Sequence, residues 1–97
     1  MQNELFKILE FGDGTKWFVI GITNYNNETY KYLIKVNNEE TDFIDEFLLV
    51  KYYIKDGKEY IVKVKDSKIS ETVMLKIMPE IKPLLSHKKE ILEKLQA

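Results

Sequence analysis

The sequence predicts an α+β domain, in which an antiparallel sheet of about five strands is followed by two C-terminal helices. Apolar runs flank Gly12-Asp13-Gly14, and a regular alternation of side chains surrounds Asp56-Gly57. Both patterns are typical of β-hairpins. Beyond Asp66 the apolar residues recur at helical spacing instead. Strands first and helices afterwards are the pattern of an α+β domain.

The length of the chain, 97 residues, is that of one domain. We expect a single domain over residues 1–97, with the sheet in 1–66 and the helices in 67–97. Cysteine is absent, which removes disulfides, thiol catalysis and most zinc sites, and which fits a reducing compartment. The start shows no targeting pattern, and no apolar run approaches the length of a membrane span. A cytoplasmic protein without a membrane partner is therefore expected.

The net charge of −1 combines two opposed halves. Residues 1–46 hold 4 lysines against 9 acids (−5), and residues 47–97 hold 11 lysines against 7 acids (+4). Arginine is absent. Because arginine supplies the planar fork that reads guanine edges and clamps phosphates, its absence argues against a dedicated nucleic-acid reader.

The first three strands follow from apolar runs and the turns between them. Leu5 to Phe11 and Thr15 to Thr23 form the first predicted hairpin. The segment Asn24 to Glu28 is rich in asparagine, which tolerates left-handed backbone and favours a turn. A third strand is predicted from Thr29 to Val36, and an acidic connection follows from Asn37 to Glu46.

The central hairpin follows this connection, and its register depends on the length of its loop. A two-residue loop, Asp56-Gly57, would place Val50 opposite Lys63 and so mix apolar and charged side chains on one face. A three-residue loop from Lys55 to Gly57 keeps the two kinds apart, with Gly57 in the left-handed position of a bulge. We therefore predict the three-residue loop, with the pairs Tyr52–Tyr60, Val50–Val62 and Leu48–Val64.

Two helices complete the predicted domain. Ser67 or Ser70 is expected to cap the first helix, and Pro79 is expected to end it. The second helix is predicted from about Pro83, because proline suits a first helical turn.

Residues that could carry catalysis are scarce. The one histidine, His87, lies among lysines, and no cysteine or second histidine can complete a metal or catalytic site with it. The three serines all lie where helix caps or turns are expected. We predict no enzyme activity, no metal and no cofactor.

The outward face of the sheet is the candidate for partner binding, because it is expected to mix basic and apolar side chains. Three interpretations stay open: the helices cover its apolar members, it binds a protein, or it binds single-stranded nucleic acid. The candidate partner-binding residues are Lys31, Leu33, Lys35, Leu49, Lys51, Tyr53, Ile61, Lys63 and Lys65.

The order of elements resembles the YrzB-like family of small uncharacterised bacterial proteins. The resemblance covers about Leu5 to Met78 and is carried by patterning: the turn FGDG, the aromatic segment NYNNETYKYLIKV, the acidic connection NNEETDFIDE, and then a hairpin and a helix. This chain is less acidic than that pattern and adds a lysine-rich tail from Pro79. The resemblance implies a small cytoplasmic bacterial domain, with no catalytic residues to carry over.

These observations together predict a non-catalytic cytoplasmic domain that binds a protein partner or its own copy. One alternative is a nucleic-acid-associated or ribosome-associated accessory protein, which the +4 half of the chain would suit. Another alternative is a small inhibitor of a host protein carried by a mobile element.

Overall fold

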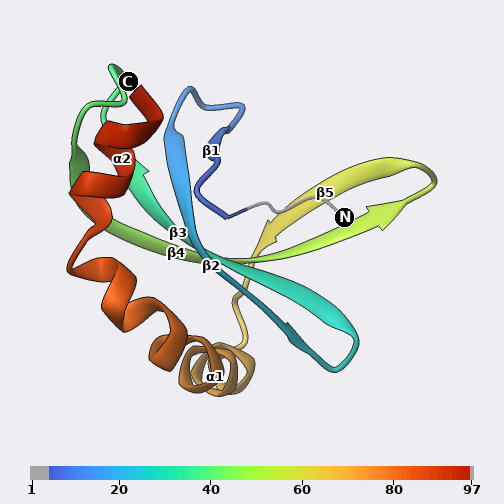
Figure 1. The fold of residues 1–97 in the computed structure, drawn as a ribbon. Coiled ribbons are helices and arrows are strands. Elements are labelled where there is room, and N and C mark those ends of the chain that lie inside the picture. Colours follow the sequence, from blue (N-terminus) through green and yellow to red (C-terminus); the bar gives the residue numbers. More distant parts are fainter. Residues whose placement is uncertain (1–4, 97) are drawn as a thin grey trace.

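The computed structural model describes residues 5–96, so both ends of the predicted domain 1–97 lie outside the description. It contains a five-stranded antiparallel sheet, in the order β1-β2-β3-β4-β5, followed by two helices (Figure 1). This arrangement confirms the predicted α+β architecture. The elements are β1 (Ile8–Glu10), β2 (Lys16–Tyr25), β3 (Glu28–Val36), β4 (Phe43–Lys55), β5 (Lys58–Lys63), α1 (Ser67–Leu85) and α2 (Lys88–Gln96).

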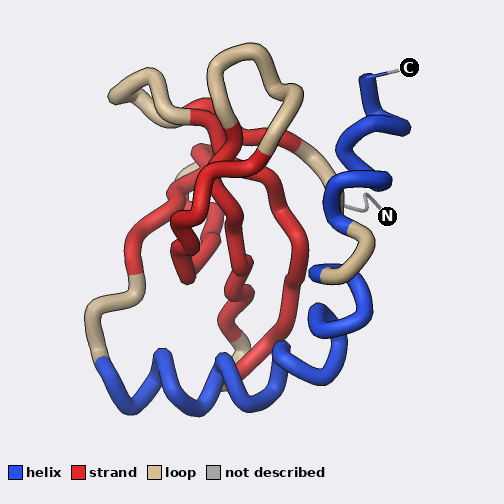
Figure 2. Tube along the Cα trace, turned by 90° about the vertical axis from the view of Figure 1, so that its left-hand side faces the viewer, coloured by secondary structure: helices blue, strands red, loops and turns tan. Residues whose placement is uncertain are grey.

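The sheet is strongly curled, and both helices wrap around one side of it (Figures 1 and 2). Register shifts interrupt the pairing of β2 with β3 between Val19 and Gly21, and the pairing of β3 with β4 between Ile34 and Val36. Such shifts bend strands and increase their twist. The curl therefore has a local cause in the pairing of the central strands.

Because the sheet curls, it buries apolar side chains on both faces. On the helix side, Phe18, Ile20, Ile34 and Val36 pack with residues of α1 and α2, namely Ile77, Ile81 and Leu92. On the inner side of the curl, a second cluster joins Trp17, Val19, Leu33 and Val50. Burial on both faces makes β2 and β3 the centre of the domain.

At Gly21 on β2, the helix packs closely against the sheet. A Cβ atom there would lie 2.5 Å from Cγ2 of Ile81 and 2.9 Å from Cδ1 of Ile77. Both isoleucines are completely buried on α1. Only a residue without a side chain lets them pack directly on the strand.

The N-cap of helix α1 lies one residue before the first of the predicted caps. Oδ1 of Asp66 accepts hydrogen bonds from the backbone N–H groups of Lys68 (2.9 Å) and Ile69 (3.2 Å). Asp66 is thus the N-cap, and the prediction of Ser67 or Ser70 in that role was wrong. A carboxylate at this position satisfies two otherwise free donors and also suits the positive end of the helix.

Pro79 does not end α1, although the sequence had suggested that it would. The helix runs through Pro79 and Pro83 to Leu85, and α2 begins at Lys88 rather than near Pro83. Proline crowds the preceding turn and bends a helix, and Figure 2 shows such a bend along α1. The buried residues Val73, Ile77 and Ile81 lie on both sides of Pro79, so packing on the sheet holds the helix together across it.

The predicted loop of the β4–β5 hairpin was also wrong. Lys55 pairs with Lys58, Tyr53 with Tyr60 and Val50 with Lys63, so the loop has two residues. Asp56 (φ 52°) and Gly57 (φ 77°) both have left-handed backbone, as the tight turn preferred by hairpins requires. The predicted pairs Tyr52–Tyr60, Val50–Val62 and Leu48–Val64 do not form.

The wrong prediction of the loop length has a physical reason. Sorting of apolar and polar side chains sets a register only where one face of the strand is buried. All six residues of β5 are exposed, so burial places no such demand on this strand. The turn geometry of Asp56-Gly57 then decides the pairing.

We expect Gly21→Ala to lower the free energy of unfolding by about 1–3 kcal/mol, because the added methyl group would overpack the contact with Ile77 and Ile81. Gly12→Ala is the matched control, since a Cβ there would meet nothing within 4 Å. Denaturant unfolding of the two variants measures the difference. Equal stability of both would contradict the packing described for Gly21.

Candidate functional site

The nine candidate partner-binding residues do not share one face of the sheet. Directly opposite residues of an antiparallel pair point to the same side. Tyr32 lies opposite Leu49, and Leu33 lies opposite Leu48, so Leu33 and Leu49 point to opposite sides. One side carries Lys31, Leu33, Lys35, Ile61 and Lys63, the other carries Leu49, Lys51 and Tyr53, and Lys65 follows the end of β5.

Burial separates the nine residues further. Leu33 is completely buried, Lys31 is 2% exposed and Leu49 is 9% exposed. The ammonium of Lys31 lies 4.1 Å from the ring centre of Tyr52, a cation–π contact on the inner side of the curl. Partner binding stays a prediction, but these three residues belong to the interior of the domain.

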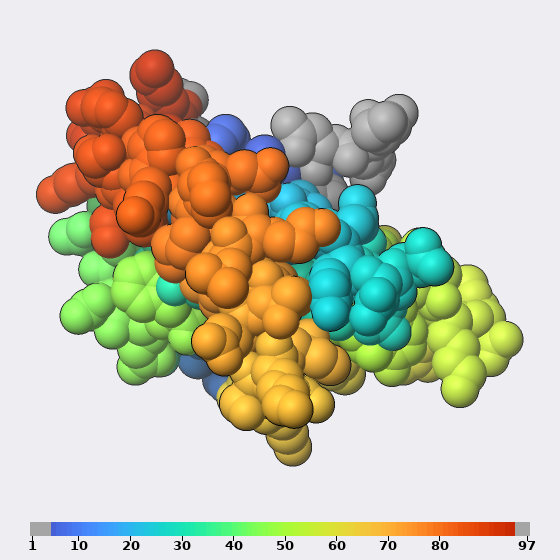
Figure 3. Space-filling model, turned by 90° about the horizontal axis from the view of Figure 1, so that it is seen from below, coloured from blue at the N-terminus to red at the C-terminus, as the bar shows by residue number. Residues whose placement is uncertain are grey.

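The exposed apolar residues gather instead on the β4–β5 hairpin. Of the eight large apolar side chains exposed in the described residues, five lie on its paired part, residues 50–63. The hairpin projects from the body in Figure 1, and in Figure 3 its yellow-green end extends beyond the orange α1. We call these five residues the hairpin surface: Tyr53, Ile54, Tyr60, Ile61 and Val62.

Both sides of the hairpin contribute to this surface. Tyr53 and Tyr60 stack on one side, with ring centres 5.2 Å apart, and Val62 shares that side. Ile54 and Ile61 point to the other side, next to Tyr52. The hairpin is thus apolar on both of its sides, which is unusual for a ribbon surrounded by water.

The outer edge of β5 is open. Among residues 5–96, β5 pairs only with β4. The N–H of Val64 donates to the Leu49 carbonyl at 3.1 Å, which sets the alternation of hydrogen bonds along the hairpin. By that alternation, Tyr60 and Val62 bond to β4, whereas the N–H and C=O groups of Glu59, Ile61 and Lys63 point away from the sheet.

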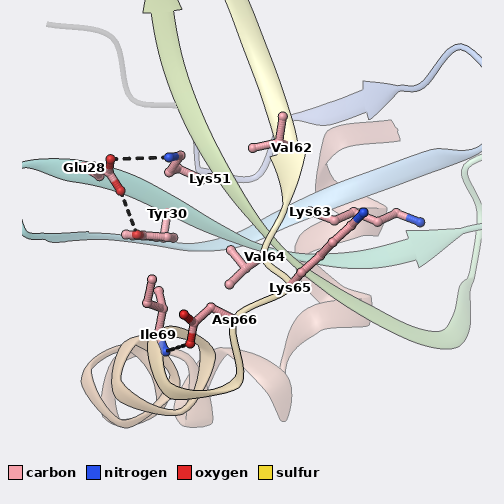
Figure 4. A pocket seen from close by; sticks show the side chains of 9 residues that line it. All are labelled: Glu28, Tyr30, Lys51, Val62, Lys63, Val64, Lys65, Asp66 and Ile69. Atoms are coloured by element: carbon pink, nitrogen blue, oxygen red, sulfur yellow. Dashed lines mark hydrogen bonds and ion pairs between the residues drawn. The ribbon is translucent and has the colours of Figure 1, made fainter.

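A small polar hollow lies beside the base of the hairpin, where β3, β4 and β5 meet the start of α1 (Figure 4). Its volume is about 170 Å³. In it the Tyr30 hydroxyl donates to Oε2 of Glu28 at 2.9 Å, and the Lys51 ammonium donates to Oε1 at 3.3 Å. The hollow is lined by Glu28, Tyr30, Lys51, Val62, Val64 and Ile69, together with Lys63, Lys65 and Asp66.

Two groups of the hollow, Glu28 and Tyr30, shift each other's pKa. The hydrogen bond from Tyr30, and then that from Lys51, lowers the pKa of the Glu28 carboxyl below its ordinary value. Burial, and then the Glu28 carboxylate, raises the pKa of the Tyr30 phenol. The ionised Glu28 carboxylate and the protonated Tyr30 phenol are thereby favoured together, which is a structural role.

This cluster could have been predicted from the sequence, given the pairing of the third strand with the hairpin. Tyr30 and Lys51 are direct neighbours across β3 and β4, and Glu28 is two residues from Tyr30 on the same side. A correct register between the third strand and the hairpin would have brought the three together.

Two kinds of site are absent from the described part of the chain. Between residues 5 and 96, no helix is long and apolar enough to cross a membrane. Within the same residues, no three side chains of His, Cys, Asp or Glu gather in a way that could hold a metal ion.

Comparison with family models, with curated proteins and with solved structures finds no match for this chain. The resemblance to the YrzB-like family therefore stays a prediction.

We expect Glu28→Gln to flatten the acid side of the stability profile. A carboxyl whose pKa is lowered by folding stabilises the fold above its unfolded pKa, and this contribution is lost as the pH falls. The unfolding free energy of the variant should therefore decrease less than that of the parent between about pH 5 and pH 3. Tyr30→Phe, which removes the stronger donor, should act in the same direction. Profiles parallel to the parent for both variants would show that the cluster does not shift the carboxyl.

Proposed function

We propose that this chain is a non-catalytic protein-interaction domain that binds through the hairpin surface and the open edge of β5. A cytoplasmic, reducing setting is part of the proposal, supported by the absence of cysteine. The observation that carries it is that all six residues of β5 are exposed and combine apolar side chains with an unpaired edge.

Exposed apolar side chains and free backbone groups both favour association. Burying an isoleucine or a valine stabilises a complex by about 1.5–3 kcal/mol, before the costs of association are subtracted. An added strand can also pair with the outward N–H and C=O groups of β5, which is a common mode of peptide recognition. The two apolar sides of the hairpin therefore supply affinity, and its open edge fixes the direction of the bound strand.

The lysines support a protein partner over a nucleic acid. On the body of the domain, Lys16 lies 2.8 Å from Glu40, Lys35 lies 3.4 Å from Glu46, and Lys51 lies 3.3 Å from Glu28. Neighbouring carboxylates thus offset part of the positive charge that a phosphate backbone would need.

A pair of glutamine substitutions tests the proposal. Ile61→Gln changes the hairpin surface, where Ile61 is 37% exposed, whereas Leu75→Gln removes an even more exposed apolar side chain from α1, where Leu75 is 72% exposed. We expect Ile61→Gln to reduce binding to protein partners, the chain's own copy included, by about tenfold. The reason is that the complex would bury a polar amide in place of an apolar side chain. Leu75→Gln should bind like the parent.

Binding is measured by quantitative capture from a cell lysate together with light scattering of the purified chain. Unfolding curves establish that both variants are folded. Equal loss of binding in both variants, or the absence of any protein ligand and of self-association in the parent, would contradict the proposal.

A further inference from the structure

The structure points to a second copy of this chain as the occupant of the open edge. We propose that β5 pairs antiparallel with β5 of the second copy, with Ile61 on the two-fold axis. This inference rests on the proposed function and adds the identity and register of the partner. It joins two five-stranded sheets into one continuous sheet.

The hydrogen-bond alternation of the hairpin limits how two such edges can meet. Only Glu59, Ile61 and Lys63 direct their backbone groups outward. In an antiparallel pair these residues must lie opposite one another, so the register can change only in steps of two residues. Three arrangements pair Ile61 with one of these outward residues of the second copy.

One of the three arrangements places opposite charges across from each other and also places apolar side chains across from each other. With Ile61 opposite Ile61 of the second copy, Glu59 lies opposite Lys63 at both ends of the edge. Tyr60 lies opposite Val62 on the other side of the ribbon. The other two arrangements place Ile61 opposite Glu59 or opposite Lys63, so that a charged group faces an apolar one. Opposite charges across a strand pair stabilise it, and like charges destabilise it.

The side chains needed for this pairing are accessible. All residues of β5 are exposed, and the hairpin projects beyond the helices (Figures 1 and 3). One carboxylate oxygen of Glu59 accepts a hydrogen bond from the Tyr52 hydroxyl at 3.0 Å. A carboxylate has two oxygens, so the other remains for Lys63 of the second copy.

The expected dimer is weak, because the shared edge spans only the six residues of β5. Interfaces smaller than the standard size are typical of transient complexes. Self-association should therefore depend steeply on concentration and should be followed up to about 1 mM, the range of weak affinities.

Charge reversal tests the register with the full chain. Glu59→Lys and Lys63→Glu each turn both charge pairs of the dimer into like-charge pairs. Each variant alone should dimerise at least about tenfold more weakly than the parent. In an equimolar mixture, the two lysines on the edge of the Glu59→Lys variant face the two glutamates on the edge of the Lys63→Glu variant. The mixture should therefore recover dimerisation, and sedimentation velocity at matched concentrations measures all four samples.

Matched reversals on the helices control for net charge. Glu71→Lys and Lys89→Glu change the charge by the same amounts at exposed positions of α1 and α2, and each should dimerise like the parent. A parent that stays monomeric at about 1 mM overturns the inference. Reversal variants that dimerise like the parent, or whose mixture fails to recover, also overturn it. If the parent is monomeric but captures another protein in an Ile61-dependent way, the proposed function stands and only the second copy is excluded.

A cysteine at the axis provides a direct reading of register. Because the chain has no cysteine, Ile61→Cys introduces a single thiol. Across a hydrogen-bonded pair the two Cα atoms lie about 5.5 Å apart, within the range of a disulfide. Mild oxidation should link Ile61→Cys into covalent dimers faster than Tyr60→Cys, whose thiols lie away from the axis. Equal rates would contradict the register.

Discussion

The close contact between α1 and β2 at Gly21 is the constraint on which the domain depends. It lets Ile77 and Ile81 pack directly on the sheet, so a single long helix can follow the curl. The helix is held by burial along its length, which explains why Pro79 and Pro83 bend it without ending it. The opposite side of the sheet closes on its own cluster around Trp17 and Leu33. Both faces of the central strands are thereby used, and the part of the β4–β5 hairpin beyond Val50 is left outside the buried clusters.

The position of β5 outside the buried clusters explains the register of the hairpin. In β2 and β3, buried side chains favour one pairing strongly, because a slip of one residue would turn the apolar set outward. In β5 no side chain is buried, and the left-handed pair Asp56-Gly57 sets the alignment. The result places Lys63 opposite Val50, a pair that burial would have rejected. The same lack of burial leaves apolar side chains and an open edge available to a partner.

Much of the architecture could be predicted from the sequence, because strands, helices and turns depend on local patterns. The alternation around Asp56-Gly57, the turn after Tyr25 and the change of period beyond Asp66 all correspond to elements of the structure. The register of the hairpin could not, because it depends on whether β5 is buried. The C-terminal end of α1 could not either, because buried residues on both sides of Pro79 carry the helix through it. The placement of Leu33 and Leu49 on one face was wrong, because it assumed a pairing that the structure does not have. Partner binding by the candidate residues stays a prediction. Exposure of Ile61, Lys63 and Tyr53 was the part of that site that a local pattern could indicate.

The pairing proposed for β5 joins three features. These are an exposed edge, an alternation of hydrogen bonds and a second copy of the chain. Residue-resolved amide hydrogen exchange, recorded at low and at high protein concentration, measures all three at once. At low concentration the amides of Tyr60 and Val62 should be protected, whereas those of Glu59, Ile61 and Lys63 should exchange rapidly. At high concentration the second group should gain protection. Rapid exchange of Tyr60 and Val62, or an Ile61 amide that stays unprotected at every concentration, would contradict the claim.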